Sequence, residues 1–360
     1  MASKKTFRKL VLQLHLWIGI AAAVLLLLTG ASGALLVFET QIDQVLNSKL
    51  VRVAPAANTL SLSELKSGLE RQYPGGRVLS FDLSDAPDVA YAASLQPASG
   101  DALDVAVDQY TGKALGVWDD TRFTRKLHDF HTHLLAGQIG SAIVAWGSVI
   151  LLFLSISGLI LWWRSKIFGV NFRTSGAKFQ YDLHSTLGAA SSLFLLAFAL
   201  TGIVVHWEGP ARRWANGVSD VPGRPPQPKP EPPAAGTVPL DPSQLLARAR
   251  AVVPGARATA IGFADNPTTP VLVLMKFPED HTPAGRTRVF LDAYSGKVLT
   301  LVSSRTAPPA VSYVTRVNRE IHTGDIGGWP TRILAAVFSL ALPLLAITGP
   351  LLWWQRRQRG

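Results

Sequence analysis

The chain of 360 residues contains no cysteine. This absence excludes disulfide bonds, thiolate metal sites, iron–sulfur clusters and the covalent C-x-x-C-H attachment of haem. Charged residues are also few, at 16% of the chain against 48% hydrophobic residues, and acids are outnumbered, with 24 Asp and Glu against 35 Lys and Arg. These proportions lie between those of a soluble domain and those of a protein embedded throughout in a membrane. We therefore expect a chain that is part membrane-embedded and part water-soluble.

Long apolar runs supply the membrane part. Four of them reach the roughly 19 residues that a helix needs to cross a bilayer. The predicted transmembrane helices cover residues 14–38, 127–163 with an entry segment, 183–207, and 321–354 with an entry segment. The first run is longer than the apolar region of about 7–15 residues in a secretory signal, so we expect an uncleaved anchor.

The basic residues predict the orientation of these helices. The N-terminus (1–13), the loop 164–182 and the tail 355–360 together carry eleven Lys and Arg and one acid, Asp182. By the positive-inside rule these three segments are cytoplasmic, and the two large polar regions lie on the opposite side. The net charge of +11 is thus explained by topology, and we expect no nucleic-acid partner.

The two large polar regions repeat one pattern. Residues 39–126 and 241–320, the latter after a proline-rich linker at 208–240, each show a helical segment, a Pro-Gly stop and alternating strands. Each region then contains the signature Asp-x-Tyr-[Ser/Thr]-Gly-Lys-x-Leu, which starts at Asp108 and again at Asp292 and is typical of a tight turn between strands. The pattern predicts two small α+β domains.

The apolar segments repeat as well. Leu14-His15 with Gly19 matches Leu183-His184 with Gly188, and Ser157-Gly158 before Trp162-Trp163 matches Thr348-Gly349 before Trp353-Trp354. The chain is therefore predicted to be a tandem duplication of helix, α+β domain and helix.

The duplication pairs the membrane histidines. His15 corresponds to His184, and His131 corresponds to His322, which predicts one pair at each face of the membrane. Two neutral imidazoles from facing helices form a closed axial ligand set for haem iron, suited to electron transfer. A single histidine at a membrane interface is more often a polar anchor or a helix cap, so the hypothesis depends on the pairing.

Three further histidines are candidates. His128 and His133 flank His131, which leaves open which of the three is the ligand on that side, and His206 ends the third span. Small residues near the four paired histidines would let a flat macrocycle approach the backbone: Gly19, Gly137, Gly140, Gly188, Gly327 and Gly328. The glycines of Thr29-Gly30, Gly158, Thr201-Gly202 and Thr348-Gly349 are interpreted as ordinary helix-packing residues.

These motifs together resemble the PepSY-associated transmembrane family. The resemblance rests on the His15 span, the entry Leu127–Gly137, the entry Ile321–Gly324, the Trp-Trp exits and the two Tyr-[Ser/Thr]-Gly-Lys turns, in that order along nearly the whole chain. It implies a polytopic α-helical membrane protein, a four-helix transmembrane bundle with two periplasmic α+β PepSY-like domains. It also implies that His15, His131, His184 and His322 hold two b-type haems per chain.

The resemblance further implies a bacterial inner-membrane oxidoreductase that reduces a ferric siderophore on the periplasmic side and releases iron as Fe(II). The electron donor would be a quinol or a cytoplasmic reductase. The alternative is a PepSY-domain scaffold or regulator of periplasmic proteases without redox activity. The paired histidines favour the oxidoreductase, because a scaffold has no need of them. A transporter is disfavoured, since no span carries a charged residue at its centre.

Overall fold

The structure is a computed structural model that describes residues 2–118, 122–219, 228–264 and 266–358. The chain forms two compact units. The membrane unit consists of Met1–Glu39, Phe123–Trp214 and Tyr313–Gly360, and the sheet unit consists of Thr40–Arg122 and Ala215–Ser312. Each unit is built from both halves of the sequence.

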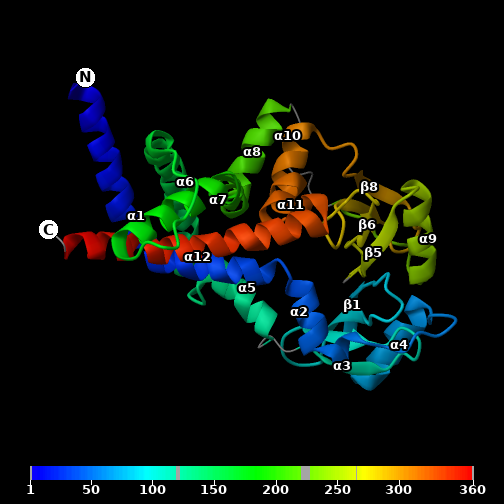
Figure 1. Cartoon of the computed structure of the whole chain (residues 1–360). Helices are drawn as coiled ribbons and strands as arrows, with labels where there is room; N and C mark the ends of the chain where they lie inside the picture. Colours follow the sequence, from blue (N-terminus) through cyan, green and yellow to red (C-terminus); the bar gives the residue numbers. More distant parts are fainter. Residues whose placement is uncertain (1, 119–121, 220–227, 265, 359–360) are drawn as a thin grey trace. The chain divides into compact units, whose positions relative to one another are not determined.

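Four long helices form the membrane unit (Figure 1). They are α1 (Ala2–Leu36), α6 (Gly137–Ser165), α7 (Gly176–His206) and α12 (Trp329–Arg357). Each is long and apolar enough to cross a membrane, which confirms the four predicted spans, although the helices extend beyond the predicted bounds. At about 1.5 Å per residue the shortest is roughly 43 Å long, more than the hydrocarbon thickness of a bilayer.

The entry segments of the second and fourth spans are separate helices, α5 (Phe123–His133) and α11 (Asn318–Thr323). Between α5 and α6 three residues have left-handed backbone, Leu134, Leu135 and Gly137, with φ of 51°, 56° and 55°. Gly324 and Gly328, with φ of 80° and 67°, end α11 and start α12. These conformations break the helix, so each entry segment is free to take its own direction.

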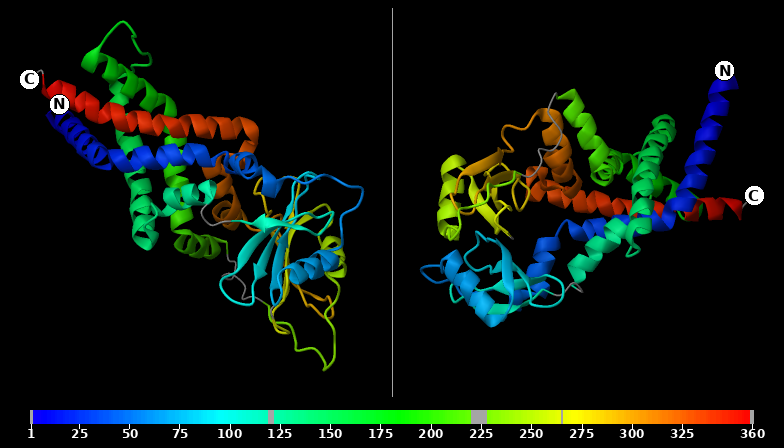
Figure 2. Two further views of the ribbon diagram at one scale, coloured as in Figure 1. Left: turned by 90° about the horizontal axis from the view of Figure 1, so that it is seen from below. Right: turned by 180° about the vertical axis from the view of Figure 1, so that it is seen from behind.

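The sheet unit contains one antiparallel sheet of eight strands in the order β4-β3-β2-β1-β5-β6-β7-β8 (Figure 2). The strands are β1 (Arg77–Asp82), β2 (Tyr91–Gln96), β3 (Leu103–Val107), β4 (Ala114–Val117), β5 (Arg257–Gly262), β6 (Val271–Lys276), β7 (Thr287–Leu291) and β8 (Val298–Val302). The halves meet where β1 pairs with β5, with Phe81 opposite Ile261. The predicted pair of separate domains is thus one continuous sheet, because two otherwise open edge strands satisfy each other.

Helices α4 (Leu62–Gln72) and α9 (Pro242–Val252) contribute to a single core with the sheet. Ser61 and Glu64 form the predicted capping box at the start of α4. The fully buried Leu65, Phe81 and Ile261 belong to this core. Burying such side chains stabilises the fold by about 1.5–3 kcal/mol each relative to exposure.

The remaining helices are α2 (Glu39–Leu46), α3 (Ser48–Val51), α8 (Glu208–Val218) and α10 (Pro309–Ser312), with a π-helical turn at Tyr313–Val317 and a 3-10 turn at Asp325–Gly327. The predicted linker at 208–240 therefore begins with a helix, α8, and its residues 220–227 lie outside the described residues. Arg212 forms an ion pair with Glu208 one turn earlier in α8. Such a pair adds to helix stability in a segment that has few apolar residues.

The two signature turns are structural, as the sequence pattern indicates. Asp108 Oδ1 accepts the Tyr110 N–H at 2.8 Å, and Asp292 Oδ1 accepts the Tyr294 N–H at 2.9 Å. In both turns the following glycine is left-handed, with φ of 72° and 67°. A side-chain oxygen thus closes each turn.

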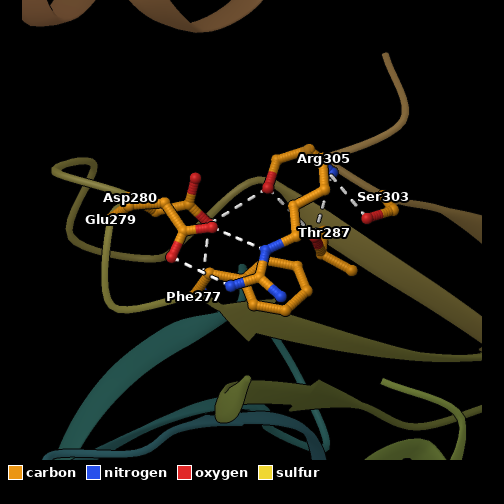
Figure 3. A network of polar contacts seen from close by, with 7 residues as sticks. Phe277, Glu279, Asp280, Thr287, Ser303 and Arg305 are labelled. Carbon is orange, nitrogen blue, oxygen red and sulfur yellow. Dashed lines mark hydrogen bonds and ion pairs between the residues drawn. The ribbon is translucent and has the colours of Figure 1, made fainter. Parts of the chain in front are cut away.

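A polar network fixes the segment after β8 to the β6–β7 loop (Figure 3). The Arg305 guanidinium lies 3.7 Å from the Phe277 ring centre and donates to both Glu279 carboxylate oxygens, at 2.6 and 3.1 Å. Asp280, only 2% exposed, accepts from the Phe277 N–H at 3.0 Å and from the Ser304 hydroxyl at 3.2 Å. The network satisfies the hydrogen-bonding capacity of a buried carboxylate.

Candidate histidine-pair sites

His15 and His184 form the first pair of the membrane unit. They come from α1 and α7, and their ring centres lie 6.5 Å apart with the ring planes at 85°. The structure therefore brings together two residues separated by 169 positions in the sequence, as the duplication predicts.

His131 and His322 form the second pair. They come from the short helices α5 and α11, with ring centres 6.4 Å apart and planes at 56°. The Phe198 ring packs edge-on against His322 at 6.2 Å. The two pairs thus have nearly the same separation and differ in the angle between their rings.

Every paired histidine contacts a hydroxyl group through its Nδ1 atom. The four distances are 2.8 Å from His15 to Ser157, 2.9 Å from His184 to Thr348, 3.0 Å from His131 to Ser32 and 2.9 Å from His322 to Thr201. Each hydroxyl lies on a neighbouring long helix in the same half of the sequence as its histidine. One edge of each ring is therefore held by a helix, and Nε2 lies on the ring's other side.

A glycine follows each of these hydroxyl residues and makes room for the ring. A Cβ atom at Gly158 would lie 3.3 Å from His15 Cε1, and one at Gly349 would lie 3.3 Å from His184 Cε1. The corresponding distances are 3.0 Å from Gly33 to His131 Cε1 and 3.6 Å from Gly202 to His322 Cε1. Gly158 and Gly349 thus pack against an imidazole, and at Gly202 a Cβ would meet the Ser148 hydroxyl at 2.7 Å before the ring of His322.

The sequence prediction also missed the dipeptide in α1. Ser32 and Gly33, which lie 169 positions before Thr201 and Gly202, contact His131, and neither was among the residues that the sequence singled out. Gly30 does pack between helices, since a Cβ there would lie 2.7 Å from Pro343 Cδ. Applying the duplication offset strictly would have identified the correct pair.

Burial keeps the second pair neutral. Desolvation among the packed helices, together with smaller effects of the nearby His322 and His128, lowers the pKa of His131 to about 4, and a backbone hydrogen bond opposes the shift. Desolvation likewise lowers the pKa of His322 to about 4, with a smaller contribution from Arg319. A neutral imidazole has a free lone pair, which is the form that binds a metal.

The other candidate histidines lie elsewhere. His128 is half-exposed, with Nδ1 3.6 Å from Glu39, and His133 Nδ1 lies 3.2 Å from Asp129. The His206 ring packs on Trp207 with centres 5.1 Å apart. Of the trio 128, 131 and 133, His131 is the one whose ring lies beside that of His322.

The small residues expected to admit a macrocycle have mixed roles. Gly140 lies against the His133 carbonyl, where a Cβ would come within 1.6 Å, so it lets α5 and α6 join. Gly137 and Gly328 supply left-handed turns, and Gly327 packs on Thr331. At Gly19 and Gly188 a Cβ would meet one leucine methyl at 3.7 Å, which leaves these two compatible with the original expectation.

The separation of the two ring centres in each pair matches that of two imidazoles bound to one metal ion. A metal–nitrogen bond of about 2.0–2.1 Å and a distance of about 1.1 Å from ring nitrogen to ring centre, set by bonds near 1.33 Å, give about 6.3 Å between ring centres. The observed 6.5 and 6.4 Å agree with this value. No cluster of three or more His, Asp or Glu that could hold a metal occurs in the described part of the chain, so each pair would supply two protein ligands.

Four membrane-crossing helices, two histidine pairs and an α+β sheet unit define an integral membrane protein with soluble parts. The family described as the PepSY-associated TM region matches residues 12–356. The chain belongs to this family. No curated protein matches it.

Proposed function

We propose that the protein is a di-haem b oxidoreductase of the bacterial inner membrane that passes electrons across the membrane to a periplasmic ferric siderophore. The observation that carries this proposal is the presence of two imidazole pairs at the separation that one hexacoordinate iron requires. A metal with two protein ligands needs further ligands from elsewhere, and the four nitrogens of a porphyrin complete octahedral coordination. Two b-type haems per chain fit this donor set.

The positions of the pairs along the helices suit a route across the membrane. On α1, the first pair lies at the level of His15, and the second pair lies at the level of Ser32, which contacts His131. These two residues are 17 positions apart, or about 26 Å of helix. His184 and Thr201 have the same spacing on α7. An apolar cluster that includes Leu26, Leu151 and Leu195 belongs to the same helices, so the core between the two levels is apolar.

A bound haem would supply one-electron chemistry between Fe(III) and Fe(II). His15, His184, His131 and His322 would hold the haems through their imidazoles, and the lowered pKa of His131 and His322 would keep those two rings neutral. The contact between each Nδ1 and a helix hydroxyl orients the ring. Little movement of the protein would then be needed when the charge of the site changes. Equal ligation in both oxidation states favours electron transfer over oxygen binding.

The substrate and the membrane topology in this proposal are taken from the resemblance to the family. Reduction releases iron from a siderophore because hard oxygen donors that suit Fe(III) hold Fe(II) much more weakly. The sheet unit would form the periplasmic part that meets the chelate, and the basic 164–182 segment would be cytoplasmic, beside a quinol or reductase donor. The recurrence of each histidine–hydroxyl contact at offsets of 169 and 191 residues supports the tandem duplication.

The absorption spectrum of the purified protein tests the proposal. Oxidised and dithionite-reduced spectra with a pyridine haemochrome are expected to give sharp low-spin bands and about two b haems per chain. The single variants His184→Ala and His322→Ala are each expected to lose one haem. His206→Ala serves as a control that keeps both, as does His281→Ala, because His281 is an exposed residue of the loop between β6 and β7 in the sheet unit. A protein that stays colourless when expressed with haem precursor refutes the proposal and leaves the protease scaffold in its place.

A further inference from the structure

The four hydroxyl groups beside the histidines each donate their hydrogen to a partner other than the imidazole. Each donates to the backbone carbonyl four residues earlier in its own helix: Ser157 to Phe153 at 2.7 Å, Thr348 to Leu344 at 2.8 Å, Ser32 to Leu28 at 2.8 Å and Thr201 to Ala197 at 2.6 Å. A hydroxyl has one proton and two acceptor lone pairs. Toward the imidazole each oxygen is therefore an acceptor, and the histidine Nδ1 must carry the hydrogen.

We propose that Ser32, Ser157, Thr201 and Thr348 are positioning residues that fix the Nδ1–H tautomer of the paired histidines and lower the reduction potential of the metal between them. With the proton on Nδ1, the lone pair is on Nε2. No rotation or proton transfer is then needed before the ring binds iron. The inference rests on the proposed haem function and adds to it four residues that do not touch the haem.

The effect on the potential follows from charge. A hydrogen bond accepted from the Nδ1–H group makes the imidazole a stronger electron donor, in the way that a second partner raises the basicity of a ligating histidine. A stronger donor stabilises Fe(III) more than Fe(II), because the oxidised iron has the higher charge. Removing the hydroxyl is therefore expected to raise the potential of that pair's haem and to weaken haem binding by about 10- to 100-fold, the usual cost of losing such a partner.

The chain supplies matched variants. Ser157 and Thr348 occupy equivalent positions, as do Ser32 and Thr201. The variant Ser157→Thr therefore keeps a hydroxyl at this position, and threonine already makes the equivalent contact at position 348. Thr348→Val removes the hydroxyl at nearly constant shape. Ser191 is a control on α7, because it is fully buried and donates to the Leu187 carbonyl at 2.7 Å, two helical turns from His184.

The experiment is a redox titration of the solubilised di-haem protein, followed in the α-band, with haem transfer to excess apomyoglobin as a second readout. Ser157→Ala and Thr348→Val are expected to raise the potential of one component and to speed release of one haem. Ser32→Ala and Thr201→Val are expected to do so for the other component. Ser157→Thr and Ser191→Ala should match the unsubstituted protein in both readouts.

The outcomes separate this proposal from the haem assignment. A wild-type chain without haem removes the proposed function itself. If the wild-type chain binds two haems and Ser157→Ala leaves both potentials and both release rates unchanged, or shifts them no more than Ser191→Ala, the positioning role is refuted. If Ser157→Ala binds no haem, Ser157→Thr decides: retention by the threonine variant supports the role of the hydroxyl, and loss in both variants overturns it.

Discussion

The substitution Gly158→Ala tests whether the space beside the His15 ring is needed for haem binding as well as for helix packing. The new Cβ would lie 3.3 Å from His15 Cε1, closer than the optimal carbon–carbon contact of about 3.5–4.0 Å. The ring must then move by a few tenths of an ångström, at the limit of the roughly 0.5 Å tolerance of a preorganised site. Overpacking of this kind costs about 1–3 kcal/mol.

Because the ring is the displaced group, we expect this cost to appear in haem binding. At about 1.4 kcal/mol per factor of ten, haem affinity at the His15–His184 pair should fall roughly 10- to 100-fold, while the His131–His322 pair is unaffected. Gly349→Ala should act on the same pair, since its Cβ would lie 3.3 Å from His184. Haem transfer to apomyoglobin measures the effect as a faster rate for one of the two haems.

Gly30→Ala is the control. Its Cβ would lie 2.7 Å from Pro343 Cδ and 2.9 Å from Leu342 Cβ. This variant should lower the midpoint of thermal unfolding, yet release both haems at the wild-type rate well below that temperature. If Gly158→Ala releases haem no faster than Gly30→Ala does, the contact between Gly158 and His15 has no bearing on ligation, and the reasoning fails.

Two further predictions concern folding. Gly112→Ala and Gly296→Ala should each destabilise the sheet unit by about 1–2 kcal/mol, because alanine is strained at φ of 72° and 67°; the midpoint of chemical denaturation measures this, and asparagine at the same positions should be tolerated better. In the haem-free protein, His131 and His322 keep a pKa of about 4, whereas in the unfolded chain a histidine titrates near 6.5. The unfolded state therefore binds more protons than the folded state between these pH values. The free energy of unfolding should fall by up to about 3 kcal/mol per histidine as the pH drops from 6.5 to 4. If His131→Gln leaves the pH dependence of the free energy of unfolding unchanged, the lowered pKa of His131 is contradicted.

Much of the membrane unit could be predicted because it depends on composition and repetition. Apolar runs of sufficient length predict helices regardless of their contacts. The duplication then matched His15 to His184 and His131 to His322 without knowledge of the packing. The hydroxyl partners could not be found in this way, because a helix that is apolar on all sides does not indicate which face meets which neighbour.

The sheet unit shows a second limit. Alternating residues predict strands and their buried face, but they do not indicate which edge strands will pair. The union of β1 with β5 joins residues such as Phe81 and Ile261 across 180 positions and had no local signal. The break after α5 was equally hidden, because it lies at Leu134 and Leu135, and leucine rarely has positive φ.

Each half of the sequence holds its own histidines in place but completes neither pair. Ser157 and Ser32 contact the Nδ1 atoms of His15 and His131 in the first half, and the second half has the equivalent contacts for His184 and His322. A half-length chain would therefore carry two well-formed but incomplete sites, and two identical copies could complete both only by assembling as a symmetric dimer. A single polypeptide that carries both halves does not have that requirement, and its two halves differ where they pack: Phe194 stacks on Phe338, whereas the first half has Leu25 against Gly147.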